Sequence, residues 1–483
     1  MQFNSYFFIF FFLPLTVIGY FLLSRIHEKL GKLFLIGLSV WFYGAFGWEV
    51  LLILGISLTV NYSFSLLIQK QKAPRLWTAV GIAANIGVLF YFKYFNFAIS
   101  IIDDYFHGQV PFQNILLPVG ISFYTFQQIA YLVDAYRGEC EGNTLHEYLF
   151  YILFYPKLLM GPLVSQSQLL PQYRDASRIR VDTERLASGL EMFGLGLFKK
   201  VILADTFARA VMWTGGDSGY FSQGDMILVM LSYTFQIYFD FSGYSDMAIG
   251  IGKMLNFDLP MTFDSPYQSF SIREFWKRWH ISLTKFLTKY VYIPLGGNRK
   301  GKVRTYLNIL IVFLISGIWH GANWTFILWG LLHGLFCILD RVFEKTEKKI
   351  HPVFRWAVTF LIVNFLWLLF KADSVGAWWS QIMEMLRLDD FQISEGLLRC
   401  FVYRETEFFF DFFHLTSLDL YVRGLPMLIT FAAAFIICLA PENNFRRLEK
   451  KKRSVFSAIL VSICVLWSLF SMSSESVFVY FGF

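Results

Sequence analysis

Apolar runs long enough to cross a membrane recur along almost the whole chain. The first extends from Tyr6 to Ser24 and the last from Ser454 to Met472, with short polar or basic segments between the runs. Because a spanning helix needs about 20 mostly apolar residues, the pattern predicts about 10–12 transmembrane helices. We therefore expect an all-α polytopic membrane protein, with further helices that are re-entrant or lie at the membrane surface.

The composition agrees with this pattern and excludes an ordinary water-soluble fold. Hydrophobic residues make up 56% of the 483 residues and charged residues only 16%, against about 25% charged residues in soluble domains. The first apolar run has no basic residue before it and no small-residue cleavage site after it, which indicates a retained span and not a signal peptide. The net charge of +7 clusters between apolar runs, so we assign it to cytoplasmic loops and expect no nucleic-acid partner.

Basic residues between the apolar runs predict the orientation of the chain in the bilayer. Lys and Arg favour cytoplasmic loops, and they cluster in four places: Arg25, Lys29 and Lys32; Lys70, Lys72 and Arg75; Arg341, Lys345, Lys348 and Lys349; and Arg446, Arg447 and Lys450 to Arg453. Both termini are then outside the cell, as are a loop at 372–423 and a tail at 473–483. No internal repeat or linker divides the chain, so residues 1–483 are expected to form one membrane-embedded domain.

The central part of the chain does not fit a strict alternation of spans. Alternation would place the basic stretch from Arg174 to Arg185 outside the cell, which the positive-inside rule disfavours. One of the apolar stretches Ile115 to Tyr136 and Glu147 to Val164 is therefore expected not to cross. Irregular backbone at membrane depth is tolerated only where it is buried in protein or lines a cavity, so we expect a pocket in this region.

Residues 266–304 form a basic segment that is too charged to cross the bilayer. Arg273, Lys277 and Arg278 are interleaved with tryptophans, a pattern typical of a re-entrant or interfacial segment at the inner face. One interpretation is anchoring by aromatic side chains and lipid phosphates. The other is a cationic collar for a phosphate-bearing donor such as a coenzyme A thioester, because Lys and Arg bind phosphate.

Two of the eight histidines stand out. His320 lies between apolar runs, and His280 lies in the basic segment. An ionisable group among membrane runs is costly and marks function by default, and an imidazole with a pKa of about 6.5 suits general-base chemistry near neutral pH. His320 is therefore a candidate general base, with Trp319 and Asn323 as supporting residues. The alternative is a structural hydrogen bond at a helix junction, and His333 is expected to be a helix-packing residue.

Two carboxylates, Asp240 and Asp246, also lie within an apolar stretch. Six residues separate them, so on one helix they point roughly 240° apart and do not form a paired acid and base. We expect them to pair with the nearby basic segment, and a supporting catalytic role is the alternative.

Common catalytic motifs and metal-binding patterns are missing from the sequence. It contains no GxSxG elbow, P-loop, HExxH motif or dinucleotide fingerprint. The five cysteines are scattered without CxxC spacing, which disfavours a disulfide framework or a zinc site. We expect buried thiols, no metal and no bound cofactor.

Six motifs, taken together, resemble the membrane-bound O-acyltransferase superfamily, most closely its bacterial branch typified by the membrane subunit of alginate O-acetylation. In the family's order they are Leu117–Gln127, Tyr155–Pro162, Phe239–Asp246, Phe275–His280, Pro294–Asn298 and Gly317–Gly321. The resemblance covers most of the chain and is weakest from Asp373 to Pro426. It implies helices around a central tunnel, a bacterial plasma-membrane location, and a donor that enters from the cytoplasm. It also implies that His320 is the catalytic histidine and His280 the second of the pair.

The last six residues, Phe478 to Phe483, fit the pattern Phe-x-Tyr-x-x-Phe. This pattern resembles a terminal motif of the same branch and of the small partner protein of teichoic-acid D-alanylation, in which the tyrosine is thought to carry the acyl group. The resemblance implies that Tyr480 is an acyl-carrying nucleophile, and its pKa of about 10 would require a base beside it. The alternative is an aromatic anchor at the membrane surface.

The residues and the resemblance together predict a membrane O-acyltransferase, and the resemblance implies acetyl-CoA as the donor. The acetyl group would pass from a cytoplasmic donor, bound at the basic segment, to Tyr480. An extracellular SGNH-hydrolase-like transferase would then move it to an extracellular or cell-wall polysaccharide. One alternative is D-alanyl transfer to teichoic acid, where the tyrosine motif lies on a separate small chain. The other is a transporter, for which an internal repeat would be expected.

Overall fold

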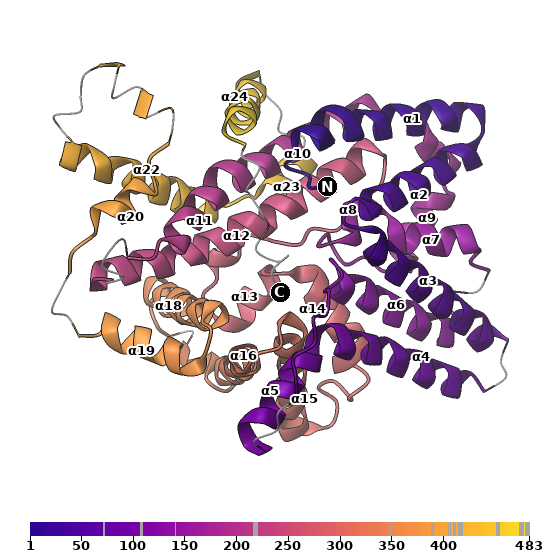
Figure 1. The fold of residues 1–483 in the computed structure, drawn as a ribbon, viewed down its shortest axis with the longest axis horizontal. Coiled ribbons are helices and arrows are strands. Elements are labelled where there is room, and N and C mark those ends of the chain that lie inside the picture. The colour runs from indigo at the N-terminus through magenta and orange to yellow at the C-terminus, as the bar shows by residue number, and fades with distance from the viewer. Residues whose placement is uncertain are drawn as a thin grey trace.

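The computed structural model describes the whole chain except residues 71–72, 107–109, 141, 216–220, 348, 388–390, 404, 406, 409–411, 414–418, 451–454, 473–477 and 479–483. Within the described residues every regular element is a helix (Figure 1). The predicted class, an all-α polytopic membrane protein, is confirmed.

Long helices dominate the N-terminal part, and short helices follow them. The long helices are α1 (Leu13–Ile26), α2 (Glu28–Gly44), α3 (Trp48–Gln69), α4 (Pro74–Leu89), α5 (Phe95–Phe106) and α6 (Ile121–Tyr136). The short ones are α7 (Leu145–Leu153), α8 (Tyr155–Leu158) and α9 (Gln166–Arg174). Single π-helical turns occur at η1 (Phe8–Phe12) and η2 (Phe90–Tyr94), and a 3₁₀ turn at η3 (Ala176–Ile179).

The central part contains α10 (Thr183–Phe198), the π-helical η4 (Lys199–Ala204), α11 (Asp205–Met212), α12 (Gln223–Met254), the 3₁₀ turn η6 (Pro266–Gln268), α13 (Ile272–Arg278), α14 (Ile281–Leu287) and the π-helical η7 (Thr288–Tyr292). The C-terminal part contains α15 (Gly301–His320), α16 (Trp324–Val342), α17 (Glu344–Glu347), α18 (Pro352–Lys371), α19 (Val375–Met385), α20 (Glu395–Arg399), α22 (Asp419–Leu439), α23 (Asn444–Glu449) and α24 (Val455–Ser471).

Six helical segments of the described chain are long and apolar enough to cross a membrane. They are Phe8–Ile26, Trp48–Gln69, Pro74–Asp104, Gly301–His320, Trp324–Val342 and Pro352–Lys371. Two shorter apolar helices, Gly424–Leu439 and Val455–Ser471, follow near the C-terminus. The chain is therefore a multi-pass membrane protein, and the number of 10–12 spans stays a prediction.

Helix α12 forms the centre of the molecule, with α10 directly against it (Figure 1). Glycines permit this close approach. A methyl group on Gly189 would lie 2.6 Å from the carbonyl oxygen of Gly250, and one on Gly196 would lie 2.6 Å from that of Gly243. Small residues at membrane helix contacts allow backbones to approach and to pack by van der Waals contact. Nearly every side chain of α12 is consequently buried.

The segments that were expected to be irregular are broken into short helices. The stretch Glu147 to Val164 contains α7, with nine residues, and α8, with four. At 1.5 Å per residue neither approaches the roughly 30 Å thickness of a bilayer core. Most of this stretch is nevertheless buried in protein, and the basic segment 266–304 likewise holds only short helices before α15.

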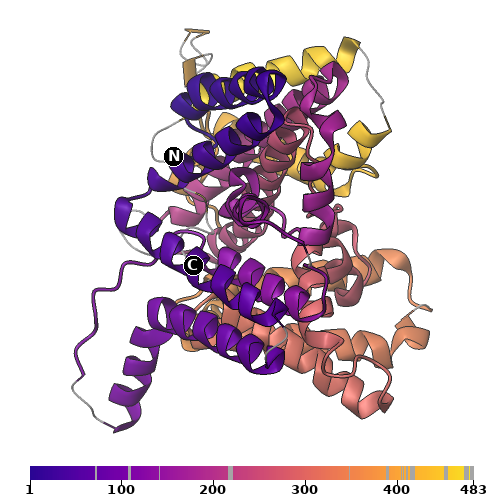
Figure 2. The ribbon, with the colours of Figure 1, turned by 90° about the vertical axis from the view of Figure 1, so that its right-hand side faces the viewer.

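The first residues and the last long helix lie side by side, as Figure 2 shows for the indigo and yellow ribbons. The Tyr6 hydroxyl donates a hydrogen bond of 2.6 Å to the carbonyl oxygen of Leu469 in α24. Phe3, just before Tyr6, is buried against Tyr244 in the middle of α12, with ring centroids 4.8 Å apart. The N-terminal segment thus reaches the centre of the helix bundle.

Candidate active site

His320 is the last residue of α15, at the sharp reversal into α16. The two helices cross at Gly317, where a methyl group would lie 2.3 Å from the carbonyl oxygen of Phe326. Asn323 caps α16: its side-chain oxygen accepts from the Thr325 amide at 3.1 Å, and its nitrogen donates to the Asp373 carbonyl at 2.9 Å. Asn323 therefore shapes the turn after His320.

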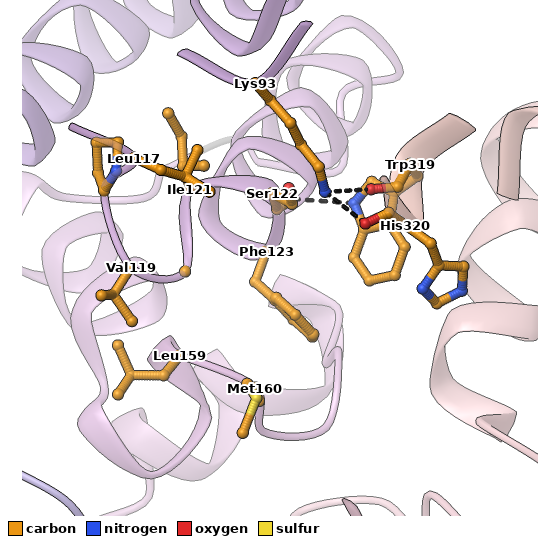
Figure 3. A pocket seen from close by; sticks show the side chains of 12 residues that line it. Lys93, Leu117, Val119, Ile121, Ser122, Phe123, Leu159, Met160, Trp319 and His320 are labelled. Carbon is orange, nitrogen blue, oxygen red and sulfur yellow. Dashed lines mark hydrogen bonds between the residues drawn. The ribbon is translucent and has the colours of Figure 1, made fainter. Parts of the chain in front are cut away.

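Aromatic rings enclose the buried His320 side chain. Its ring centroid lies 4.8 Å from that of Trp319, 5.2 Å from that of Trp329 and 5.2 Å from that of Phe370. Trp319 is itself fixed by Phe123 at 5.2 Å, and its indole N–H donates to the Ser122 carbonyl at 3.4 Å (Figure 3). These contacts confine the imidazole to an apolar environment.

Lys93 holds the end of α15 from outside that helix. Its ammonium donates to the carbonyl oxygens of Trp319 at 2.7 Å and His320 at 2.8 Å (Figure 3). Tyr94, the next residue of η2, donates to the carbonyl of Ile318. The last carbonyls of a helix have no intrahelical partner and carry partial negative charge, so a cation is favourable there. Lys93 was not among the residues predicted from the sequence, although a single lysine inside the apolar run 74–104 was a usable signal.

A cavity of about 90 Å³ lies against His320. It is lined by Lys93, residues 117–123, Leu159, Met160, Trp319 and His320 (Figure 3). A water molecule needs about 10–15 Å³ of such space, so a small acyl group fits. Residues 117–123 and 159–160 belong to the region in which a pocket was expected, and the structure joins them to the histidine motif.

His280 lies between α13 and α14 in a left-handed conformation, with φ of 42°. A histidine in this conformation is uncommon and costs energy, which the surrounding packing must offset. Its ring contacts Phe241 at 4.8 Å and Trp319 at 6.5 Å between centroids. Nδ1 lies 3.4 Å from the Ser282 hydroxyl, and Nε2 has no hydrogen-bond partner within the described part of the chain. Both predicted histidines therefore contact the ring of the same tryptophan, Trp319.

Burial lowers the pKa of His280 from 6.5 to about 3. Removing a charged imidazolium from water is costly, so burial favours the neutral ring. His280 is therefore neutral at neutral pH, so its ring can form hydrogen bonds but carries no positive charge.

Asp240 and Asp246 form buried ion pairs, but their partners are not in the basic segment. Lys200 lies 2.6 Å from Asp240 and 2.9 Å from Asp205, and Lys199 lies 2.7 Å from Asp246. The expected pairing with residues 266–304 was therefore wrong. The partners come from η4, directly after α10, because α10 packs along α12 and brings the residues that follow it to the two carboxylates. Neither aspartate lines the cavity beside His320.

Of the three cations proposed to bind the donor, two line one cavity and the third does not. Arg273 and Lys277 line a cavity of about 260 Å³, here named the Arg273 cavity, which otherwise is mostly apolar and reaches Ser316, one turn before His320. Arg278 does not line it, and instead donates to Glu274 at 3.0 Å and to the Asp264 carbonyl at 3.1 Å. Arg278 therefore has a structural partner on its own helix.

A third cavity of about 840 Å³, here named the Asp373 cavity, lies beyond the end of α15. Its lining includes Lys93, Asn323, Trp324 and Asp373. Lys93 borders both this cavity and the one at His320, so the two adjoin. Cavities thus follow one another along α15 and its turn, with His320 between them.

The remaining sequence predictions have different outcomes. His333 is fully buried and its Nδ1 accepts from the Trp276 indole at 3.1 Å, which confirms a helix-packing role. The five cysteines carry free thiols, and three of them are buried. Tyr480 lies outside the described residues. Phe478, two positions earlier, is described and is buried against Tyr244.

The structure thus combines an all-helical membrane fold with a buried histidine pair beside a series of cavities, and comparison with known proteins identifies the class as the polytopic membrane acyltransferases. The model of the membrane-bound O-acyltransferase family matches residues 142–372, which include both histidines. A peptidoglycan O-acetyltransferase of Helicobacter pylori is 34% identical, covering 100% of this chain and 98% of that protein. The chain belongs to the membrane-bound O-acyltransferase family.

Two further relatives place the chain within this family. An alginate O-acetylase, AlgI, of Pseudomonas aeruginosa is 37% identical over 82% of this chain and 76% of its own length. A teichoic acid D-alanyltransferase of Streptococcus thermophilus is 29% identical over 50% of this chain and 60% of its own length. The bacterial branch that the motifs resemble is thereby confirmed.

Proposed function

We propose that this protein carries an acetyl group from acetyl-CoA on the cytoplasmic side of the bacterial plasma membrane to the outside, for O-acetylation of a polysaccharide. The observation that carries the proposal is the order of cavities along α15. The Arg273 cavity contacts this helix from Ile309 to Ser316, His320 follows at its end, and the Asp373 cavity begins at Ala322. A charged donor cannot cross lipid, so an acyl path inside the protein solves a physical problem.

The Arg273 cavity suits the donor. Arg273 and Lys277 would bind its phosphates, and the apolar walls would hold the pantetheine arm. Ser316 brings this cavity to within one helical turn of His320. The thioester carbonyl would then be presented to the two histidines.

The chemistry that we assign to the site is attack by an oxygen nucleophile on the thioester. His320 takes the proton of the Tyr480 hydroxyl, whose oxygen forms a bond to the acetyl carbonyl carbon. The carbon–sulfur bond breaks, and the proton passes from His320 to the departing coenzyme A thiolate. Neutral His280, whose Nε2 has no hydrogen-bond partner among the residues that the structure describes, is assigned a hydrogen bond to the carbonyl oxygen, where negative charge develops. The products are acetyl-tyrosine and free coenzyme A.

The second transfer would take place outside the cell. The acetyl–tyrosine bond breaks as the oxygen of a polymer hydroxyl forms a bond to the carbonyl carbon, and the proton of that hydroxyl passes to the tyrosine oxygen; an SGNH-hydrolase-like partner would catalyse this exchange. The sequences related to this chain include proteins named for peptidoglycan and for alginate acetylation. A polysaccharide acceptor is therefore the class that we propose.

Radiolabelled acetyl-CoA tests this function. Purified protein in lipid nanodiscs is expected to retain label at Tyr480, which peptide mass spectrometry would locate. Tyr480→Phe and His320→Ala are expected to abolish the label, because they remove the nucleophile and the base. Label that persists in Tyr480→Phe, or no label on the wild-type chain, would overturn the relay. Labelling only by a D-alanyl carrier-protein thioester would replace acetyl by D-alanyl, and solute transport without acyl turnover would favour a transporter.

A further inference from the structure

Phe478 is inserted into the helix bundle and does not lie at the membrane surface. Only 1% of its surface is exposed. Its ring meets the ring of Tyr244 edge to face, at 5.1 Å and 89°. The Tyr244 ring also stacks on the ring of Phe3, with centroids 4.8 Å apart. Phe478 thus contacts the same central residue of α12 that Phe3 of the N-terminal segment contacts.

A buried cation covers the Phe478 ring. The ammonium of Lys200 lies 4.4 Å from the ring centroid. The same ammonium pairs with Asp240 and with Asp205, which fixes its position. A cation over an aromatic face is attracted by the ring quadrupole, and the attraction grows when water is excluded. An aliphatic side chain of similar size would fill the space without this attraction.

This position is close to the histidines. Tyr244 lies three residues after Phe241 on α12, which is less than one helical turn. The Phe241 ring lies 4.8 Å from the His280 ring. Two residues of chain extend at most about 7 Å, so covalent linkage keeps position 480 within reach of the region that Phe478 occupies.

We infer that Lys200 and Tyr244 form a docking site for Phe478, which positions the C-terminal tail for loading at the histidines. This inference rests on the proposed relay through Tyr480. Lys200, Tyr244 and Phe478 are positioning residues, because none of them is assigned a contact with the donor. A carrier tail has to dock for loading and leave for unloading, and an aromatic ring on a fixed cation provides a contact that can be made and broken without covalent change.

Single-turnover acetylation of Tyr480 tests the dock. Phe478→Leu keeps an apolar side chain but removes the ring, and it is expected to slow loading about tenfold or more. Phe478→Trp keeps an aromatic face and is expected to load at close to the wild-type rate. The KM for acetyl-CoA should stay unchanged in both, because Phe478 does not line the Arg273 cavity. Phe470→Leu is the matched control, since Phe470 is 83% exposed near the end of α24.

A second measurement reports docking without any donor. A cysteine placed at position 479 by Val479→Cys is treated with a maleimide, and its labelling is measured by mass spectrometry. With Phe478 present it should react slowly, and Phe478→Leu should raise its rate about tenfold or more if the tail is released. Equal rates would overturn the dock, as would wild-type loading in Phe478→Leu. If the wild-type chain takes no acetyl label but the leucine variant still exposes the cysteine, the relay fails and the dock stands.

Discussion

Lys93 and His320 are 227 residues apart in the chain, and a hydrogen bond of 2.8 Å joins the Lys93 ammonium to the His320 carbonyl oxygen. The bond is made to the backbone of the histidine, so Lys93 fixes where α15 ends. It also borders both the cavity at His320 and the Asp373 cavity. The position of His320 and the charge beside it therefore depend on Lys93, a side chain from η2.

Replacing Lys93 by Met should impair catalysis more than folding. The substitution removes two hydrogen bonds from a charged group, each worth about 1.5–3 kcal/mol, and leaves two helix-end carbonyls without this partner. We expect kcat to fall at least about tenfold, with a small change in KM, because the donor cavity is not touched. Steady-state acetylation with purified protein would measure this. Lys29→Met, at an exposed lysine in the first turn of α2, is the control, and wild-type kcat in Lys93→Met would refute the role.

The crossing of α15 and α16 should tolerate no side chain at Gly317. A methyl group there would lie 2.3 Å from the Phe326 carbonyl oxygen, so Gly317→Ala must push the helices apart. Overpacking of this kind costs about 1–3 kcal/mol. A lower thermal unfolding midpoint in nanodiscs, together with reduced activity, is the expected result. Gly55→Ala serves as the matched control, because nothing lies within 4 Å of a methyl group at that position of α3. Equal midpoints for the two variants would contradict the prediction.

Acidification should destabilise the protein through His280. Its pKa is about 3 in the folded state and about 6.5 in the unfolded chain. Between these values the unfolded state binds the additional proton, so stability is full above about pH 6.5 and falls by up to about 1.4 kcal/mol per pH unit as pH decreases toward 3. Unfolding midpoints measured from pH 7.5 to 4 should therefore decline. His280→Asn should flatten the decline, whereas His351→Asn, at an exposed histidine, should not.

The membrane helices and the two histidines of the site could be predicted from the sequence. Membrane helices are specified by local hydropathy, and His280 and His320 stand out because ionisable groups are rare in such runs. Charge alternation alone predicted that one of two stretches, Ile115 to Tyr136 or Glu147 to Val164, does not cross the membrane, and the structure breaks the second into short helices. Each of these features depends on residues that are close together in the sequence.

Contacts between distant segments were not predictable in this way. Lys93 reaches His320 from 227 residues away, and no local pattern indicates that partner. For the same reason, the predicted pairing of Asp240 and Asp246 with the basic segment 266–304 was wrong. Their partners, Lys199 and Lys200, are selected by the glycine-mediated packing of α10 on α12, which is a tertiary property.

The buried cluster of Lys200, Asp240 and Asp205 should respond asymmetrically to mutation. One ammonium serves two carboxylates, at 2.6 and 2.9 Å. Lys200→Met leaves Asp240, which is 1% exposed, without its cation, and breaking such a buried pair costs about 3–5 kcal/mol. Asp240→Asn should cost less, because Lys200 keeps Asp205. Adding Asp240→Asn to Lys200→Met should restore most of the lost stability, because the fully buried carboxylate is then neutral and the remaining one, Asp205, has a side chain that is 25% exposed to solvent. Equilibrium unfolding in mixed micelles would give the three values.

Glu395→Gln, in the exposed pair with Arg399, is the control and should change stability by less than about 1 kcal/mol. If the double variant were as unstable as Lys200→Met alone, packing and not charge would explain the loss.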